Sequence, residues 1–152
     1  MQQFRILNSK ETKEILRLLE KQFSFKNKLE YAFLKNKEDL YLISRGIAKI
    51  DTKKFRINNL GLYFGEIKNN IIRLSIEASQ LIGEKSGKNI LTLDDEQVLY
   101  WIAGDNVQIE TGLKGYVLIK HKQDYLGCGY VKDKTLINYV PKERRLKLKA
   151  VS

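Results

Sequence analysis

The sequence contains few of the residues that build disulfides, metal sites and membrane spans. Its 152 residues include one cysteine, Cys128, and one histidine, His121, so we expect neither an internal disulfide nor a four-ligand zinc site. No apolar run approaches the roughly 18 residues that a membrane-spanning helix needs. Residues 1–7 lack the apolar core of a secretion signal. We therefore expect a cytoplasmic protein with no metal, no cofactor and no membrane contact.

Motifs for catalysis and nucleotide binding are also absent. The sequence has no GxxxxGK[ST] phosphate-binding loop and no GxGxxG turn that opens a helix. Cys128 lies between two glycines in an apolar run, where a free cysteine is usually a small buried hydrophobe, so a nucleophilic pair with His121 is the weaker interpretation. Asp94, Asp95 and Glu96 come at a predicted helix start, where acidic residues more often stabilise the helix dipole than bind metal. We expect no enzymatic activity.

Positive charge is what the sequence has in excess. Its 28 lysines and arginines against 18 acidic residues give a net charge of +10, which favours a polyanionic partner and nucleic acid above all. The charge is uneven: +7 over residues 1–83, −4 over residues 84–110 and +7 over residues 111–152. We expect the acidic middle segment to face away from a polyanion. The alternative is a lysine bias of the proteome without any nucleic-acid ligand.

The hydrophobic pattern of residues 1–83 predicts a small α/β unit. An amphipathic helix over about residues 9–22 begins beside Asn8 and Glu11, which have the spacing of a capping box. Shorter periodic segments predict strands at 29–35, 40–43, 60–67 and 71–76 and helices at 45–51 and 75–81. Residues 83–89 contain glycine and polar residues with almost no apolar content, so they are the best candidate for a linker.

From residue 90 onward the pattern changes to short strands. A strand at 90–93 precedes a helix that starts at Asp94 and ends at Gly104. The residues of this helix expected to face inward are Val98, Leu99, Trp101 and Ile102. Four strands then predict a small β-barrel or sandwich, at 107–109, 115–120, 125–131 and 136–140. The fold class is therefore α+β, with an N-terminal domain over 1–83 and a C-terminal domain with a basic tail over 84–152.

The basic tail is the best candidate for a nucleic-acid contact. In an extended chain, alternation from Arg145 to Lys149 would place cations on one side and Leu146 and Leu148 on the other, where the leucines would anchor the tail. The cations expected to contact phosphate are Lys120, Lys142, Arg144, Arg145, Lys147 and Lys149. Tyrosines near lysines can stack on unpaired bases, although each alone is more often a half-buried strand residue: Tyr116, Tyr125, Tyr130 and Tyr139. A solvated tail that binds nothing is the alternative.

Short motifs in the C-terminal half resemble those of the PUA domain, a small β-barrel that binds RNA. They are Gly104-Asp105-Asn106-Val107, similar to its G-D-x-V strand start, and Asp124-Tyr125-Leu126-Gly127-Cys128-Gly129, similar to its D-x-L-G-x-G strand. Nearly the whole chain also looks like the Nip-seven family of ribosome-biogenesis proteins, in which a pre-PUA α/β domain precedes the PUA domain. The segments that carry this similarity are Leu60-Gly61-Leu62-Tyr63-Phe64-Gly65 and Ile71-Ile72-Arg73-Leu74-Ser75-Ile76. Similar two-domain ends also occur fused to RNA cytosine methyltransferases.

The resemblance implies a non-enzymatic RNA-binding protein of ribosomal RNA processing and large-subunit assembly, or an archaeal stand-alone relative. Ribosomal RNA or its precursor would bind the PUA domain, with contacts carried by Arg144, Arg145, Lys147 and Lys149. Residues 1–83 would contact a protein partner in ribosome assembly, and we expect a monomer. Two alternatives stay open: an accessory module that delivers RNA to a separate methyltransferase or pseudouridine synthase, and a protein adaptor that binds no RNA.

Overall fold

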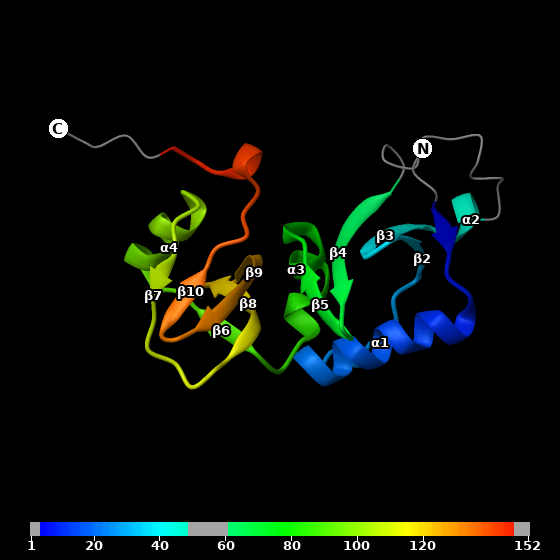
Figure 1. The fold of residues 1–152 in the computed structure, drawn as a ribbon, viewed down its shortest axis with the longest axis horizontal. Coiled ribbons are helices and arrows are strands. Elements are labelled where there is room, and N and C mark those ends of the chain that lie inside the picture. The colour runs from blue at the N-terminus through cyan, green and yellow to red at the C-terminus, as the bar shows by residue number, and fades with distance from the viewer. Residues whose placement is uncertain (1–3, 49–60, 148–152) are drawn as a thin grey trace.

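The protein is built from two five-stranded sheets with the helix α3 (Ile76–Ile82) between them (Figure 1). The computed structural model describes residues 4–48 and 61–147. The predicted α+β fold class is therefore confirmed at the level of two sheets with helices. Of the predicted helix over 45–51, only α2 (Arg45–Ala48) falls among the described residues, and Leu148 and Lys149 lie outside them.

The N-terminal half is an antiparallel sheet covered by one long helix. Its strands follow sequence order, and they are β1 (Arg5–Ile6), β2 (Tyr31–Asn36), β3 (Asp39–Ser44), β4 (Leu62–Lys68) and β5 (Ile71–Leu74). Helix α1 (Ser9–Phe23) begins with the predicted capping box, since the Asn8 side chain accepts from Glu11 N and the Glu11 side chain accepts from Asn8 N. The Gln22 side chain bonds both the N–H and the C=O of Ile72, at 2.7 and 3.0 Å, so α1 covers the open edge of β5.

The segment predicted as a linker is attached to the end of α1. Gly83–Lys85 forms one 3-10 turn (η3), and the backbone N–H groups of Gly87 and Lys88 then donate to Phe23 O at 2.8 and 3.1 Å. The Asn89 side chain donates to Gln22 O at 2.6 Å. These bonds fix the point at which the chain enters the second sheet.

The C-terminal half is a curved sheet that encloses its own core. Its elements are β6 (Ile90–Thr92), α4 (Asp95–Ile102), β7 (Val107–Gln108), β8 (Gly115–His121), β9 (Asp124–Lys132), β10 (Thr135–Ile137) and the 3-10 turn η4 (Lys142–Arg144). The strand order is β6-β8-β9-β10-β7, with β6 parallel to β8 and the other pairs antiparallel. Because β6 and β7 do not pair, the sheet is a half-barrel. Trp101 of α4 is buried in its core.

The two halves share a packed interface. Leu118 of β8 and Cys128 of β9 belong to the same buried cluster as Phe23 and Phe64 of the N-terminal half. The end of α3 lies so close to β9 that a Cβ on Gly83 would fall 2.4 Å from the Tyr125 ring. Strand β9 is thus covered on both faces, by the barrel core and by α3.

The last strand ends earlier than predicted. The pattern indicated a strand over 136–140, but β10 stops at Ile137. The reason is Asn138, whose side-chain amide donates to Trp101 O at 2.8 Å and to Asp105 O at 3.0 Å. Its side-chain oxygen accepts from Val140 N at 2.7 Å. These side-chain bonds replace the backbone hydrogen bonds between strands and turn the chain toward the end of α4.

Candidate functional site

Helix α4 has apolar residues on two opposite faces. Trp101 points into the barrel core, with Val98 and Ile102 packed against the same cluster. A second stripe at spacings of three and four residues contains Glu96, Leu99, Tyr100 and Ala103. The prediction that Leu99 faces inward was wrong, because two residues correspond to about 200° around a helix and Leu99 lies opposite Trp101. The side chains of Leu99 and Tyr100 are 48% and 51% exposed.

Both ends of α4 are fixed by side chains. Asp94 caps the first turn by accepting from Glu96 N and Gln97 N, and the Gln97 side chain accepts from Asp94 N. At the other end Gly104 has φ +93, a conformation that other residues rarely adopt. Together with the bonds from Asn138, these contacts hold the exposed stripe in one orientation.

The C-terminal tail runs beside α4, but not in the predicted manner. Leu146 N donates to Ile102 O at 2.9 Å, and the Arg145 Nε donates to Val140 O at 2.9 Å. Leu146 is 59% exposed, so the prediction that leucine side chains anchor the tail was wrong for this residue. The backbone of Arg145 is extended after the turn η4, but the Leu146 side chain that follows it faces solvent instead of the domain. The backbone and Arg145 hold the tail instead.

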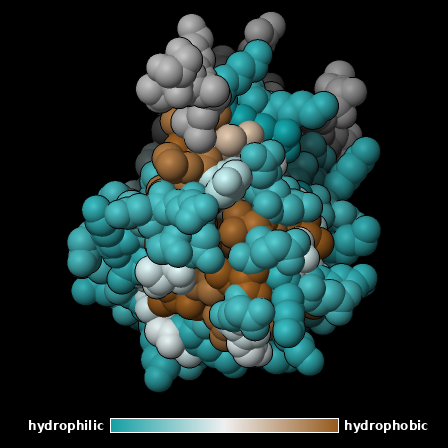
Figure 2. All heavy atoms as spheres, turned by 90° about the vertical axis from the view of Figure 1, so that its left-hand side faces the viewer, coloured by the Kyte–Doolittle hydropathy of each residue, from teal (hydrophilic) through white to brown (hydrophobic). Residues whose placement is uncertain are grey.

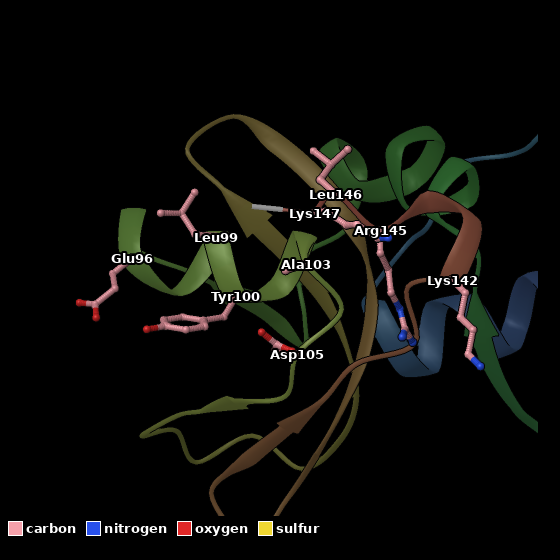
Figure 3. A pocket seen from close by; sticks show the side chains of 9 residues that line it. All are labelled: Glu96, Leu99, Tyr100, Ala103, Asp105, Lys142, Arg145, Leu146 and Lys147. Carbon is pink, nitrogen blue, oxygen red and sulfur yellow. The ribbon is translucent and has the colours of Figure 1, made fainter. Parts of the chain in front are cut away.

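Helix α4 and the tail enclose a surface depression of about 630 Å³, which we call the α4 hollow (Figure 3). It is lined by Glu96, Leu99, Tyr100, Ala103, Asp105, Lys142, Arg145, Leu146 and Lys147. Figure 2, which looks onto the C-terminal half, shows apolar surface in the middle of this face with hydrophilic side chains around it. The hollow therefore combines an aromatic ring, aliphatic walls and charges of both signs.

Residues 88–146 match the family described as Methyltransferase RsmF PUA domain. The C-terminal half is a PUA-like domain. The resemblance to PUA domains is thereby confirmed for this range, which contains the whole half-barrel, α4 and the tail as far as Leu146. A PUA-like domain suggests RNA binding in general. No curated protein matches the sequence.

The PUA-like domain brings three of the predicted phosphate contacts together. Lys142, Arg145 and Lys147 all line the α4 hollow. Among the described residues, neither lysine makes an ion pair with a carboxylate. Glu96 and Asp105 of the acidic segment line the same hollow, so this segment lies beside the basic tail, and the expectation that it faces away from a polyanion stays a prediction. The backbone bond from Leu146 to Ile102 places the tail directly beside the helix that carries these acids.

Two other predicted cations lie elsewhere. Arg144 forms an ion pair with Glu77 of α3 and thereby connects the tail to the helix between the sheets. Lys120 lies over the Tyr125 ring, with its Nζ 5.4 Å from the ring centroid, near Gln80 and Glu84. Neither residue lines the α4 hollow.

The tyrosines singled out in the sequence are occupied by other contacts. Tyr116 packs against Tyr130 and Tyr139 with ring centroids 4.9 and 6.0 Å away, and Arg73 covers the Tyr139 ring at 4.9 Å. Burial and the neighbouring Tyr139 raise the pKa of Tyr116 to about 12. Among the described residues the most exposed tyrosine is Tyr100, at 51%, for which no role was predicted from the sequence. The sequence signal for an exposed Tyr100 is the unbroken run of apolar and aromatic residues from Val98 to Ile102, which makes α4 apolar on more than one face.

His121 and Cys128 occupy different environments. The His121 Nε2 lies 2.8 Å from Asp95 Oδ1, and this hydrogen bond lowers the pKa of the Asp95 carboxyl. Cys128 is buried against the N-terminal core, and burial raises the pKa of its thiol to about 12. Within residues 4–48 and 61–147, no group of three or more His, Cys, Asp or Glu side chains is placed to hold a metal ion. No helix of the described residues is long and apolar enough to cross a membrane.

Proposed function

We propose that this protein binds single-stranded or structured RNA through its PUA-like domain, with the α4 hollow as the contact surface. The observation that carries the proposal is the family match over residues 88–146, the range that contains α4 and the tail as far as Leu146. The net charge of +10 supports it, because a polyanion would be attracted to the molecule as a whole.

Two sets of side chains in the hollow suit an RNA strand. Lys142, Arg145 and Lys147 can neutralise phosphate groups, and the bond from Arg145 Nε to Val140 O orients that guanidinium while leaving its other N–H groups as donors. Tyr100 offers an exposed ring on which an unpaired base can stack. Phosphate contacts supply affinity, and the ring favours unpaired over paired nucleotides.

The experiment is a salt series of RNA binding with two charge-matched triple variants. In the first, Lys142, Arg145 and Lys147 are changed to glutamine; in the second, the exposed Lys13, Lys26 and Lys28 of the N-terminal half are changed in the same way. For single strands, log affinity falls with log salt by about 0.7 per phosphate contact, so loss of three contacts should reduce the slope by about 2. We expect that reduction in the first variant only.

If the salt slope fell equally in both variants, net charge alone would set the affinity. That result would contradict the assignment of the hollow as the contact surface. Absence of binding by the parent protein at roughly 0.15 M salt would contradict RNA binding itself and favour the protein-adaptor alternative. Thermal unfolding of all three proteins controls for loss of fold.

We further propose that the RNA is ribosomal RNA or its precursor and that the protein acts without catalysis, as a cytoplasmic monomer, in large-subunit assembly. The support is the resemblance of the segments 60–65 and 71–76, which contribute to β4 and β5, to the pre-PUA domain of the Nip-seven family. On this proposal residues 1–83 contact a protein of the assembly machinery. Co-sedimentation of the tagged protein with large-subunit precursors is expected, and its loss on deletion of the protein partner would identify that partner.

A second candidate function is delivery of RNA to a separate RNA-modifying enzyme. The name of the matched family, a PUA domain of a methyltransferase, favours it. This function predicts a stable complex with a methyltransferase or pseudouridine synthase and no enrichment on ribosome precursors. The same tagged protein, analysed on a sucrose gradient, separates the two candidates.

A further inference from the structure

The α4 hollow holds two carboxylates that phosphate binding does not use. Glu96 lies four residues before Tyr100 on the exposed stripe of α4, and Asp105 follows the helix. Among the described residues, neither side chain accepts a hydrogen bond or forms an ion pair, although Lys142, Arg145 and Lys147 line the same hollow. A carboxylate repels a phosphate but accepts hydrogen bonds, so the hollow suits a ligand that brings hydrogen-bond donors as well as phosphate.

Asp105 is the carboxylate that lies between the ring and the guanidinium. Its backbone N–H donates to Tyr100 O at 3.0 Å, and it follows Gly104, over which the Arg145 side chain lies. Asn138 holds Asp105 in place by donating to its backbone oxygen at 3.0 Å. Glu96 lies at the far end of α4 from Arg145 (Figure 3). A nucleotide whose base stacks on Tyr100 and whose phosphate meets Arg145 would therefore present its base edge to Asp105.

Base chemistry then selects one base. The Watson–Crick edge of guanine carries two adjacent donors, N1–H and the 2-amino group, which match the two oxygens of one carboxylate. Cytosine and adenine place a ring-nitrogen acceptor beside their amino group, and uracil flanks one N–H with two carbonyls, so each would turn a lone pair toward the second carboxylate oxygen.

We propose that the α4 hollow binds one unpaired guanine of its RNA ligand, with Tyr100 stacking on the base, Asp105 accepting from N1–H and the 2-amino group, and Arg145 binding the adjacent phosphate. This inference rests on the proposed RNA-binding function and adds a specificity to the same hollow. The hollow volume of about 630 Å³ is within the range of roughly 300–1,000 Å³ of sites that take small ligands.

The test uses the full chain and three RNA oligomers that differ at one base. An oligouridine heptamer carries guanosine, inosine or uridine at its centre; inosine keeps the ring size and N1–H of guanosine but lacks the 2-amino group. We expect the guanosine oligomer to bind about tenfold more tightly than the inosine oligomer, because one hydrogen bond to a charged acceptor is lost. Asp105→Asn should abolish this preference and leave or raise the affinity for the uridine oligomer, since a negative charge near phosphate is removed.

Glu96→Gln is the matched control, with the same loss of charge at the other end of the helix, and it should keep the guanosine preference. Equal affinity of the parent protein for all three oligomers would overturn the guanine inference while leaving RNA binding intact. A preference that survives in Asp105→Asn would overturn the assignment of Asp105. No binding of any oligomer or of longer RNA would overturn the proposed function as well.

Discussion

The side chain of Arg145 lies over Gly104, so closely that a Cβ at position 104 would fall 2.3 Å from Arg145 Cδ. These residues are 41 positions apart in the sequence. Their contact joins the end of α4 to the tail and places a guanidinium at the rim of the α4 hollow. The basic tail thus has a defined position on the PUA-like domain, because Gly104 has no side chain and leaves room for Arg145.

Replacing Gly104 by alanine should displace the tail and lower stability. The backbone at 104 has φ +93, and forcing a Cβ into that conformation costs about 1–3 kcal/mol. The added methyl group also meets the flexible Arg145 side chain, which must move. Chemical denaturation and RNA binding should both show a loss. Gly112→Ala is the control, because a Cβ there has no atom within 4 Å and φ at that position is not positive. Equal effects of the two substitutions would contradict the Gly104 contact.

Asn138 should contribute to stability through the hydrogens that it donates. Asn138→Asp keeps the shape and the acceptor for Val140 N but loses the bonds to Trp101 O and Asp105 O. Two carbonyls then face a carboxylate, and we expect a loss of roughly 2 kcal/mol, seen as a Tm lower by about 5 °C. Asn106→Asp makes the same chemical change where the side-chain oxygen accepts from Asn138 N, so its Tm should change little. A larger fall at Asn106 than at Asn138 would refute the assignment.

Tyr100 should matter for RNA binding through its ring. Tyr100→Leu removes the stacking surface and should weaken binding of a single-stranded oligomer roughly tenfold, whereas Tyr100→Phe keeps the ring and the affinity. Since Tyr100 is 51% exposed, neither change should lower Tm appreciably. Tyr31→Leu makes the same substitution at a tyrosine of the N-terminal half that is 41% exposed, and it should leave affinity unchanged. A Tyr100→Leu protein that binds as the parent does would exclude stacking at this ring.

Cys128 should be unreactive while the protein is folded. Its thiol is buried between the halves, and burial raises its pKa to about 12. Native protein at pH 8 should react with a thiol reagent far more slowly than protein in denaturant. The pKa of the thiol is higher in the folded protein than in the unfolded chain. The contribution of the thiol to the free energy of unfolding is therefore complete below its unfolded pKa, and it is lost as the pH rises from that value toward 12. Labelling of the native protein at the denatured rate would show that the interface opens freely.

Local signals in the sequence predicted most of the elements. The Asn8–Glu11 capping box, the acidic start of α4, Gly104 and the alternating strands each depend on neighbours within a few residues. The structure has all of them, although the last strand ends at Ile137 instead of Val140. The PUA resemblance supplied the type of the C-terminal half, which the family match supports. The division into domains at residues 83 and 84 stays a prediction.

The candidate site depended on contacts between distant residues, and the sequence could not supply these. Arg144 appeared as a free phosphate ligand, but Glu77, 67 positions away, pairs with it. Leu146 appeared as an anchor, but the tail is held by its backbone and by Arg145. Tyr100 received no role because one apolar face was assigned to α4, whereas the helix has two.

Photo-crosslinking can locate the bound RNA on the protein and so show whether it contacts the α4 hollow. A 4-thiouridine oligomer is bound, irradiated and digested, and the protein is cleaved with trypsin after lysine and arginine. Cleavage after Lys88 and Lys114 releases residues 89–114 as one peptide, which contains all of α4 and Asp105. We expect the RNA adduct to lie on this peptide and to disappear when Lys142, Arg145 and Lys147 are changed to glutamine. Adducts confined to peptides of residues 1–83 would contradict it.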